Sequence, residues 1–127
     1  MADSRDPTAA SGPSPSREKG PADPVVVVLV TAPSEEVAAE LARALVGEGL
    51  AACVNIVPGL RSIYAWKGEV CDDPEVLLVV KTRRARFAAL RDRVLALHPY
   101  ELPEVIALDV ADGHAPYLDW VRDRTRG

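Results

Sequence analysis

The stretch PVVVVLVTAPSEEVAAELARALVGEG, residues 24–49, joins a strand pattern to a helix pattern. Residues 25–30 are apolar without alternation and rich in β-branched side chains, which is typical of a strand buried on both faces. Ser34 is placed to cap a helix, and two glutamates follow it in the first turn, where they complement the helix dipole. Apolar residues then recur at helical spacing as far as Gly47, where the helix can end. We therefore expect a buried strand followed directly by an amphipathic helix.

Two long extended runs come next, and they meet at a Lys-Gly pair, residues 67–68, which is typical of a hairpin turn. The first run covers residues 50–66 and the second residues 67–82. A Pro-Gly pair at 58–59 should bend or bulge the first arm, and the Asp-Asp-Pro at 72–74 should do the same to the second. Both arms are too long for a compact domain of this size. A hairpin that overhangs its own core usually pairs with another chain.

The rest of the chain completes a known order of elements. Residues 83–98 are predicted to form a second helix, 103–110 a last strand, and 113–125 a short final helix with Pro116 in its first turn. The apolar stripe expected on the second helix consists of Phe87, Leu90, Val94 and Leu97. The order β-α-β-β-α-β is that of the ferredoxin-like α+β fold. Its two helices cover one face of the sheet, so the other face, also apolar, should be covered by neighbouring subunits.

Length, charge and composition limit the class of protein. At 127 residues the chain is one domain, predicted to span 25–125, after a disordered tail at 1–24 that is rich in Pro, Ser, Gly and charge. The net charge of −4 and the pI near 5.1 argue against broad binding of nucleic acid or an anionic membrane. The longest apolar run is too short to cross a bilayer. With no signal-like start and only two cysteines, a cytoplasmic location with reduced thiols is expected.

Three motifs resemble those of the CutA divalent-cation-tolerance proteins: CVNIVPGLRSIYAWKGEV at 53–70, LLVVKTR at 77–83, and HPYELPEVIAL with YLDW within 98–120. The resemblance covers residues 25 to about 120 and rests on all three motifs in this order at these spacings. It implies a ferredoxin-like fold assembled as a homotrimer in which long hairpins of neighbouring subunits pair. It also implies a function in tolerance of divalent metal ions, copper above all, and an architecture similar to the trimeric PII signalling proteins.

Three side chains are candidate metal ligands: the imidazole of His98, the thiolate of Cys53 and the carboxylate of Glu101. They are far apart in sequence, so only the fold or a subunit boundary can bring them together. Some bacterial CutA proteins bind copper through a cysteine at the end of the first strand and two adjacent histidines; those positions here are Val30 and the pair Leu97-His98. Because one of those three ligands remains, the resemblance implies weak binding of copper or another divalent ion, and no cofactor is required.

Other interpretations of these residues remain open. The prolines around His98 also suit a stiff joint between helix and strand, with no site at all. A basic cluster where the second helix begins could bind a small anion, as in a PII-like signalling module, or simply pair with neighbouring acids; its members are Lys81, Arg83, Arg84 and Arg86. A purely structural trimeric scaffold is the third alternative. The central strands lack the aromatics of RNA-recognition modules, and no catalytic or phosphate-binding motif is found, so we expect neither nucleic-acid binding nor an enzyme.

Overall fold

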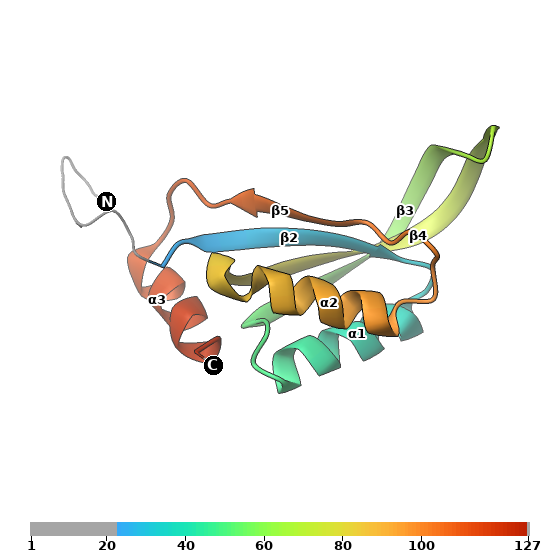
Figure 1. Cartoon of the computed structure of the whole chain (residues 1–127). Helices are drawn as coiled ribbons and strands as arrows, with labels where there is room; N and C mark the ends of the chain where they lie inside the picture. The colour runs from blue at the N-terminus through green and yellow to red at the C-terminus, as the bar shows by residue number, and fades with distance from the viewer. Residues whose placement is uncertain (1–22, 127) are drawn as a thin grey trace.

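The computed structural model describes residues 23–126, so the predicted tail at 1–24 lies almost wholly outside the described residues. The predicted ferredoxin-like order, with a long hairpin and a short C-terminal helix, is confirmed (Figure 1). The elements are β2 (Val25–Ala32), α1 (Glu35–Gly47), β3 (Cys53–Trp66), β4 (Glu69–Arg83), the 3-10 turn η1 (Arg84–Arg86), α2 (Phe87–Leu97), β5 (Val105–Asp109) and α3 (Ala115–Arg124).

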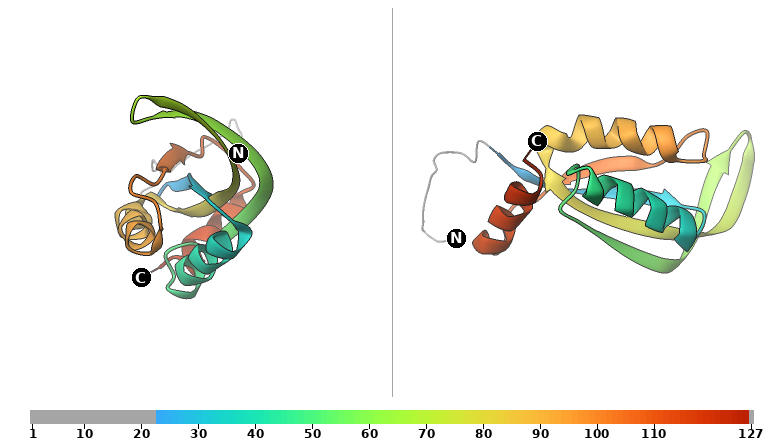
Figure 2. Two further views of the ribbon diagram at one scale, coloured as in Figure 1. Left: turned by 90° about the vertical axis from the view of Figure 1, so that its right-hand side faces the viewer. Right: turned by 90° about the horizontal axis from the view of Figure 1, so that it is seen from below.

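The four strands form one antiparallel sheet in the order β3-β4-β2-β5. Helices α1 and α2 lie side by side on one face of this sheet, while α3 lies at the end where the described chain begins (Figures 1 and 2). No helix within residues 23–126 lies over the opposite face. The architecture therefore has two layers, a helical layer and a sheet with one open face.

The core lies between the sheet and the two helices. Alternate residues of the central strands face the helices, with Val28 opposite Val80 and Val30 opposite Leu78. All four side chains are fully buried against helix residues that are at most 1% exposed, namely Ala38, Leu41, Leu45, Leu90 and Val94. Strand periodicity on one side and helical periodicity on the other thus produce a single apolar layer.

The predicted start and end of α1 are confirmed. The Ser34 hydroxyl accepts a hydrogen bond from the amide of Val37 at 3.2 Å, as a helix cap should. The helix ends at Gly47, and Gly49 follows with a φ of 72°, a conformation that costs glycine little.

The predicted bulge in the first arm of the hairpin is also confirmed. The register of β3 against β4 shifts between Val57 and Leu60, and Gly59 has a φ of 86°. Beyond this shift the hairpin leaves the plane of the sheet and arches away from it (Figures 1 and 2). We call residues 60–74 the outer arm.

The bulge predicted for the second arm is wrong. Pairing runs without a shift through residues 72–74, where Pro74 lies opposite Arg61. The outer arm has only two strands, so each strand keeps a free edge on which a proline removes no ladder hydrogen bond.

The second helix differs from its prediction at both ends. Residues 84–86 form the 3-10 turn rather than α-helix, and Leu97, predicted to be buried, is 41% exposed. The buried row instead continues from Val94 to His98, which is 8% exposed and lies four residues on. Spacing of four residues keeps both on one helix face, so the imidazole takes the place that the sequence pattern assigned to a leucine.

Two leucines of α2 test this arrangement. Leu90 is 0% exposed and Leu95 is 48% exposed. We expect Leu90→Ala to lower the free energy of unfolding by about 2–5 kcal/mol, because it leaves a cavity in the core. Leu95→Ala should cost under about 1 kcal/mol. Urea unfolding at one fixed protein concentration measures both, and equal losses would contradict the packing described.

Candidate functional site

The three predicted metal ligands do not meet within one chain. Cys53 pairs with Lys81, which is opposite Val27 on β2, whereas the ring of His98 contacts the backbone of Thr31. Val27 and Thr31 are about 13 Å apart along the strand, at ~3.3 Å per residue. Within residues 23–126 no group of three or more His, Cys, Asp or Glu side chains is placed to hold a metal ion.

Both ring nitrogens of His98 are already hydrogen-bonded. Nε2 lies 2.7 Å from the carbonyl oxygen of Thr31, and Nδ1 lies 3.1 Å from the amide nitrogen of Tyr100. A carbonyl only accepts and an amide only donates, so the proton must be on Nε2 and the lone pair on Nδ1. In this conformation the neutral imidazole joins β2, the end of α2 and the following loop, and it has no lone pair left for a metal.

Tyr100 extends this connection to the hairpin. Its ring packs 4.6 Å from the ring of His98, centroid to centroid, and its hydroxyl donates to Oε2 of Glu75 at 2.6 Å. Glu75 is only 9% exposed, so the phenol satisfies one oxygen of a largely buried carboxylate. Burial, and then the hydrogen bond to Glu75, raise the pKa of Tyr100. The loop is thereby fixed to β4 where the outer arm begins.

A second phenol–carboxylate pair lies further out on the arm. The Tyr64 hydroxyl donates to Oδ2 of Asp73 at 2.6 Å, and this hydrogen bond, with smaller contributions from burial and charge, raises the pKa of Tyr64 to about 12. On the same arm Arg61 donates to both carboxylate oxygens of Asp72 and lowers the pKa of that carboxyl. These contacts stiffen the arm from strand to strand.

Glu101 is the most exposed of the three predicted ligands. Its side chain is 71% exposed, and Oε1 lies 3.5 Å from Nζ of Lys67 at the tip of the hairpin. The same ammonium lies 5.4 Å from the ring centroid of Trp66, close enough for a cation–π contact. The HPYELP loop, residues 98–103, is therefore held to the hairpin at two places, its base and its tip.

Most side chains of the basic cluster already have polar partners within the chain. Arg86 Nε is buried and has no hydrogen-bond partner among the described residues. The other three side chains contact neighbouring polar groups: Lys81 with Asn55, Arg83 with Asp23 and Thr125, and Arg84 with Asp109. These contacts agree with paired basic residues more than with an open cradle for an anion.

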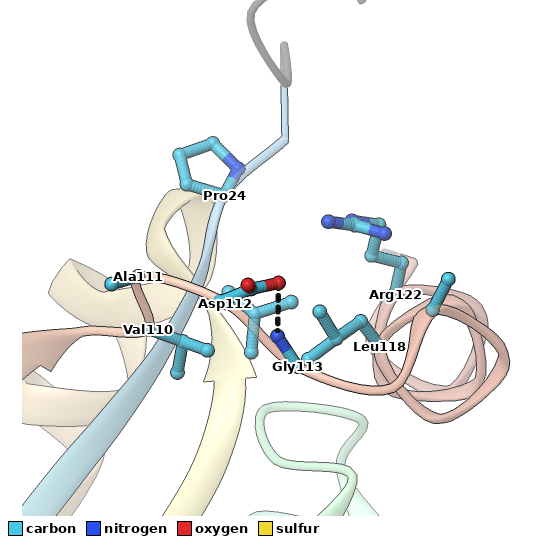
Figure 3. Close-up of a pocket in the computed structure, with 9 residues that line it drawn as sticks. Pro24, Val110, Ala111, Asp112, Gly113, Leu118 and Arg122 are labelled. Atoms are coloured by element: carbon cyan, nitrogen blue, oxygen red, sulfur yellow. Dashed lines mark hydrogen bonds between the residues drawn. The ribbon is translucent and has the colours of Figure 1, made fainter. Parts of the chain in front are cut away.

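A shallow pocket of about 220 Å³ lies between the start of β2, the loop after β5 and α3 (Figure 3). Its two charged side chains are already occupied. Asp112 accepts from the amide of Gly113 at 2.8 Å, and Arg122 binds the backbone oxygen of Asp23 at 2.8 Å. No predicted ligand lines it, so this pocket adds nothing to the candidate site.

The open face of the sheet carries an apolar surface on β2 and β5. The register places Val27 and Leu29 of β2 beside Leu108 and Ile106 of β5 on this face, whereas on the β4 side Lys81 lies beside Val27. The β5 side chains Ile106 and Leu108 are 48% and 51% exposed. This surface, expected from the apolar runs in the sequence, is of the kind that protein interfaces cover.

The two phenol–carboxylate pairs were not predicted. Strand alternation does place Asp73 and Glu75 on one face of β4, and that signal was available in the sequence. It does not say that Tyr100, 25 residues further along the chain, returns to Glu75. That contact depends on the direction of the loop after α2.

Together, the sheet order, the two helices on one face and the long hairpin define a ferredoxin-like α+β protein. A sequence profile described as CutA1 divalent ion tolerance protein matches residues 26–124. The divalent-cation tolerance protein CutA of Thermus thermophilus is 62% identical over 99 residues, 78% of this chain and 96% of that protein. Protein CutA of Homo sapiens is 48% identical over 126 residues, 93% of this chain and 70% of that protein.

Solved structures agree with these sequence relatives. The divalent cation tolerance protein Cut A1 from Thermus thermophilus superposes with a TM-score of 0.79 at 60% identity, over 80% of this chain and 99% of that one. The PII-like protein CutA from Nostoc sp. PCC 7120 superposes with a TM-score of 0.74 at 40% identity, over 80% and 97%. The chain belongs to the CutA1 divalent ion tolerance family, as the motifs in its sequence indicated.

The raised pKa of Tyr64 gives a direct test of the arm contacts. Ionisation of this phenol should occur near pH 12, and its stabilising contribution should be complete below about pH 10 and lost as the pH rises through 12. Asp73→Asn should return the pKa toward about 10, because the charge of the acceptor is removed. Titration of the tyrosine ring carbons by NMR, with Tyr64→Phe for assignment, measures this. An unchanged pKa in Asp73→Asn would show that Asp73 is not the cause.

Proposed function

We propose that this chain acts in tolerance of divalent metal ions as a homotrimer that binds such ions weakly, copper and zinc among them. Membership of the CutA1 family supports the first part, since the Thermus relative is named a divalent-cation tolerance protein. The observation that supports assembly as a homotrimer is the open apolar face of the sheet. A cytoplasmic location is proposed as well; no helix among residues 23–126 is long and apolar enough to cross a membrane.

The exposed surface supports assembly from copies of the same chain. Besides Ile106 and Leu108 on β5, the outer arm exposes Ile63 at 63% and Val70 at 80%. An arm that projects beyond its own sheet, with apolar side chains and free strand edges, can pair with a neighbour. Association would bury these side chains together with the open face, which is favourable in water.

The positions of the three ligands determine how ions are bound in this proposal. Glu101 is accessible and Cys53 is half-buried, but the two belong to different ends of the sheet. A complete set of ligands would then be formed across a subunit boundary, and Glu101 would contribute to it. His98 could join only if it gave up a hydrogen bond to Thr31 or Tyr100.

A PII-like small-ligand module is the second candidate function. The printed description of the Nostoc relative supports it. The basic cluster from Lys81 to Arg86 would contribute to binding an anion, although three of its members would first have to leave partners within the chain. A scaffold without any ligand is the third.

Calorimetric titration with Zn²⁺ and Cu²⁺ tests the metal proposal. We expect weak, saturable binding that Glu101→Gln reduces about ten- to thirtyfold at low ionic strength, the loss expected when a full charge beside a divalent ion is removed. The matched control is Glu104→Gln, which removes an equal exposed charge three residues away and should have a smaller effect.

His98→Ala tests whether His98 is a metal ligand or only a structural contact between helix and strand. It should lower the free energy of unfolding by about 1–3 kcal/mol through the two lost hydrogen bonds and leave ion affinity nearly unchanged. Loss of binding in a folded His98→Ala protein would make His98 a ligand and contradict our assignment. No ion binding in the wild type, together with thermal stabilisation by nucleotides or small acids, would favour the PII-like alternative.

A further inference from the structure

One face of the outer arm carries a row of side chains that can bind cations. Side chains alternate between the two faces of a strand, and pairing along this part of β4 is regular. One of these faces carries Glu69, Cys71, Asp73 and Glu75. Arg61, which binds Asp72, belongs to the opposite face. The row therefore combines a thiol with carboxylates, and its negative charge favours cations.

Two members of this row, Cys71 and Asp73, meet at one hydroxyl group. Tyr64 lies directly opposite Cys71 and donates to Oδ2 of Asp73 at 2.6 Å. Directly opposite side chains have their Cβ atoms about 5 Å apart, so the thiol lies beside this phenol. After the hydrogen bond to Asp73, smaller contributions from the Cys71 thiol also raise the pKa of Tyr64. The thiol and the carboxylate are therefore neighbours, and solvent reaches both, since Cys71 is half-buried and Asp73 is exposed.

We infer that Cys71 and Asp73 together bind a divalent cation of the kind that accepts thiolate, such as Zn²⁺ or Cd²⁺. The inference rests on the proposed function, because it names a site for the ions, but it uses none of the three ligands named there. Zn²⁺ bonds to thiolate sulfur at about 2.3 Å and to carboxylate oxygen at about 2.1 Å, so one ion spans donors about 4 Å apart. Within residues 23–126 no third His, Cys, Asp or Glu side chain joins them, so water completes the coordination and binding is weak.

Tyr64 orients the carboxylate without binding the ion. Its pKa of about 12 keeps the hydroxyl protonated at neutral pH, so the phenol continues to donate to Asp73. This hydrogen bond uses Oδ2 and leaves Oδ1 for the ion. A hydrogen-bonded outer partner of this kind typically changes metal affinity by about tenfold or more. The Cys71 thiol loses its proton to solvent when the ion binds, so affinity falls as the pH is lowered.

Titration of the reduced full chain with Cd²⁺ tests this site. Cd²⁺ bound to thiolate gives an ultraviolet charge-transfer band, and it does not oxidise the thiol as Cu²⁺ can. We expect a saturable band that is lost in Cys71→Ser and retained in Cys53→Ser, the matched change at the other cysteine. Retention of the band in Cys71→Ser would overturn the inference.

Asp73→Asn and Asp72→Asn form a second matched pair. Each removes one exposed carboxylate from β4, but only Asp73 shares a face with Cys71. Cd²⁺ affinity should fall about tenfold in Asp73→Asn, which loses the charge beside the ion, and about twofold or less in Asp72→Asn. Equal losses in the two variants would show a general effect of charge and overturn the inference.

The failure of this site can be told apart from the failure of the proposed function. In Glu101→Gln the thiolate band should persist, because Glu101 lies in the HPYELP loop beside Lys67 and outside the row on β4. Cd²⁺ or Zn²⁺ binding by calorimetry without a thiolate band would overturn the inference and leave the proposed function standing. No binding of either ion would overturn both.

Discussion

The structure depends on a difference between the two faces of its sheet: both are apolar, but helices cover only one. The strands β2 and β4 carry apolar side chains on both sides, yet α1 and α2 cover only one of them. On the covered side Val28, Val30, Leu78 and Val80 are fully buried; on the other side Ile106 and Leu108 are about half exposed. Among the described residues no further layer lies there, because the third helix packs at the end of the sheet. The open face follows from this difference, and the arm projects because β3 and β4 extend beyond the end of β2.

The HPYELP loop owes its shape to this arrangement. It runs from the end of α2 to β5, past the point where the outer arm leaves the sheet. On the way it contacts β2 through His98, β4 through Tyr100 and the hairpin tip through Glu101. His98 is buried as a neutral ring because each nitrogen has a backbone partner, and Tyr100 reaches Glu75 because the ring of His98 supports it. These residues act as a joint. Glu101, between the two prolines, is exposed to solvent and lies beside Lys67 at the tip of the hairpin.

Much of the fold could be predicted from local patterns. The unbroken apolar run of β2, the cap and stripe of α1, and the Lys-Gly turn each follow from short-range rules that hold in most proteins. The prediction for the buried face of α2 was wrong because contacts with residues distant in sequence determine which side chain is buried there. Leu97 lost the buried position to His98, because the usual preference for burying leucine over imidazole is reversed when the imidazole finds two backbone partners. The site was less predictable, since Thr31 and His98 or Glu75 and Tyr100 are joined only by the three-dimensional path of the chain.

We propose that copies of this chain cover the open face. Sedimentation equilibrium of the full chain, over a wide range of dilution and without added metal, measures whether they do. We expect one species of three times the 13.6 kDa mass of a single chain, persisting as the protein is diluted. A stable, well-folded monomer would contradict it, because an isolated chain would then keep Ile106, Leu108 and the outer arm in water.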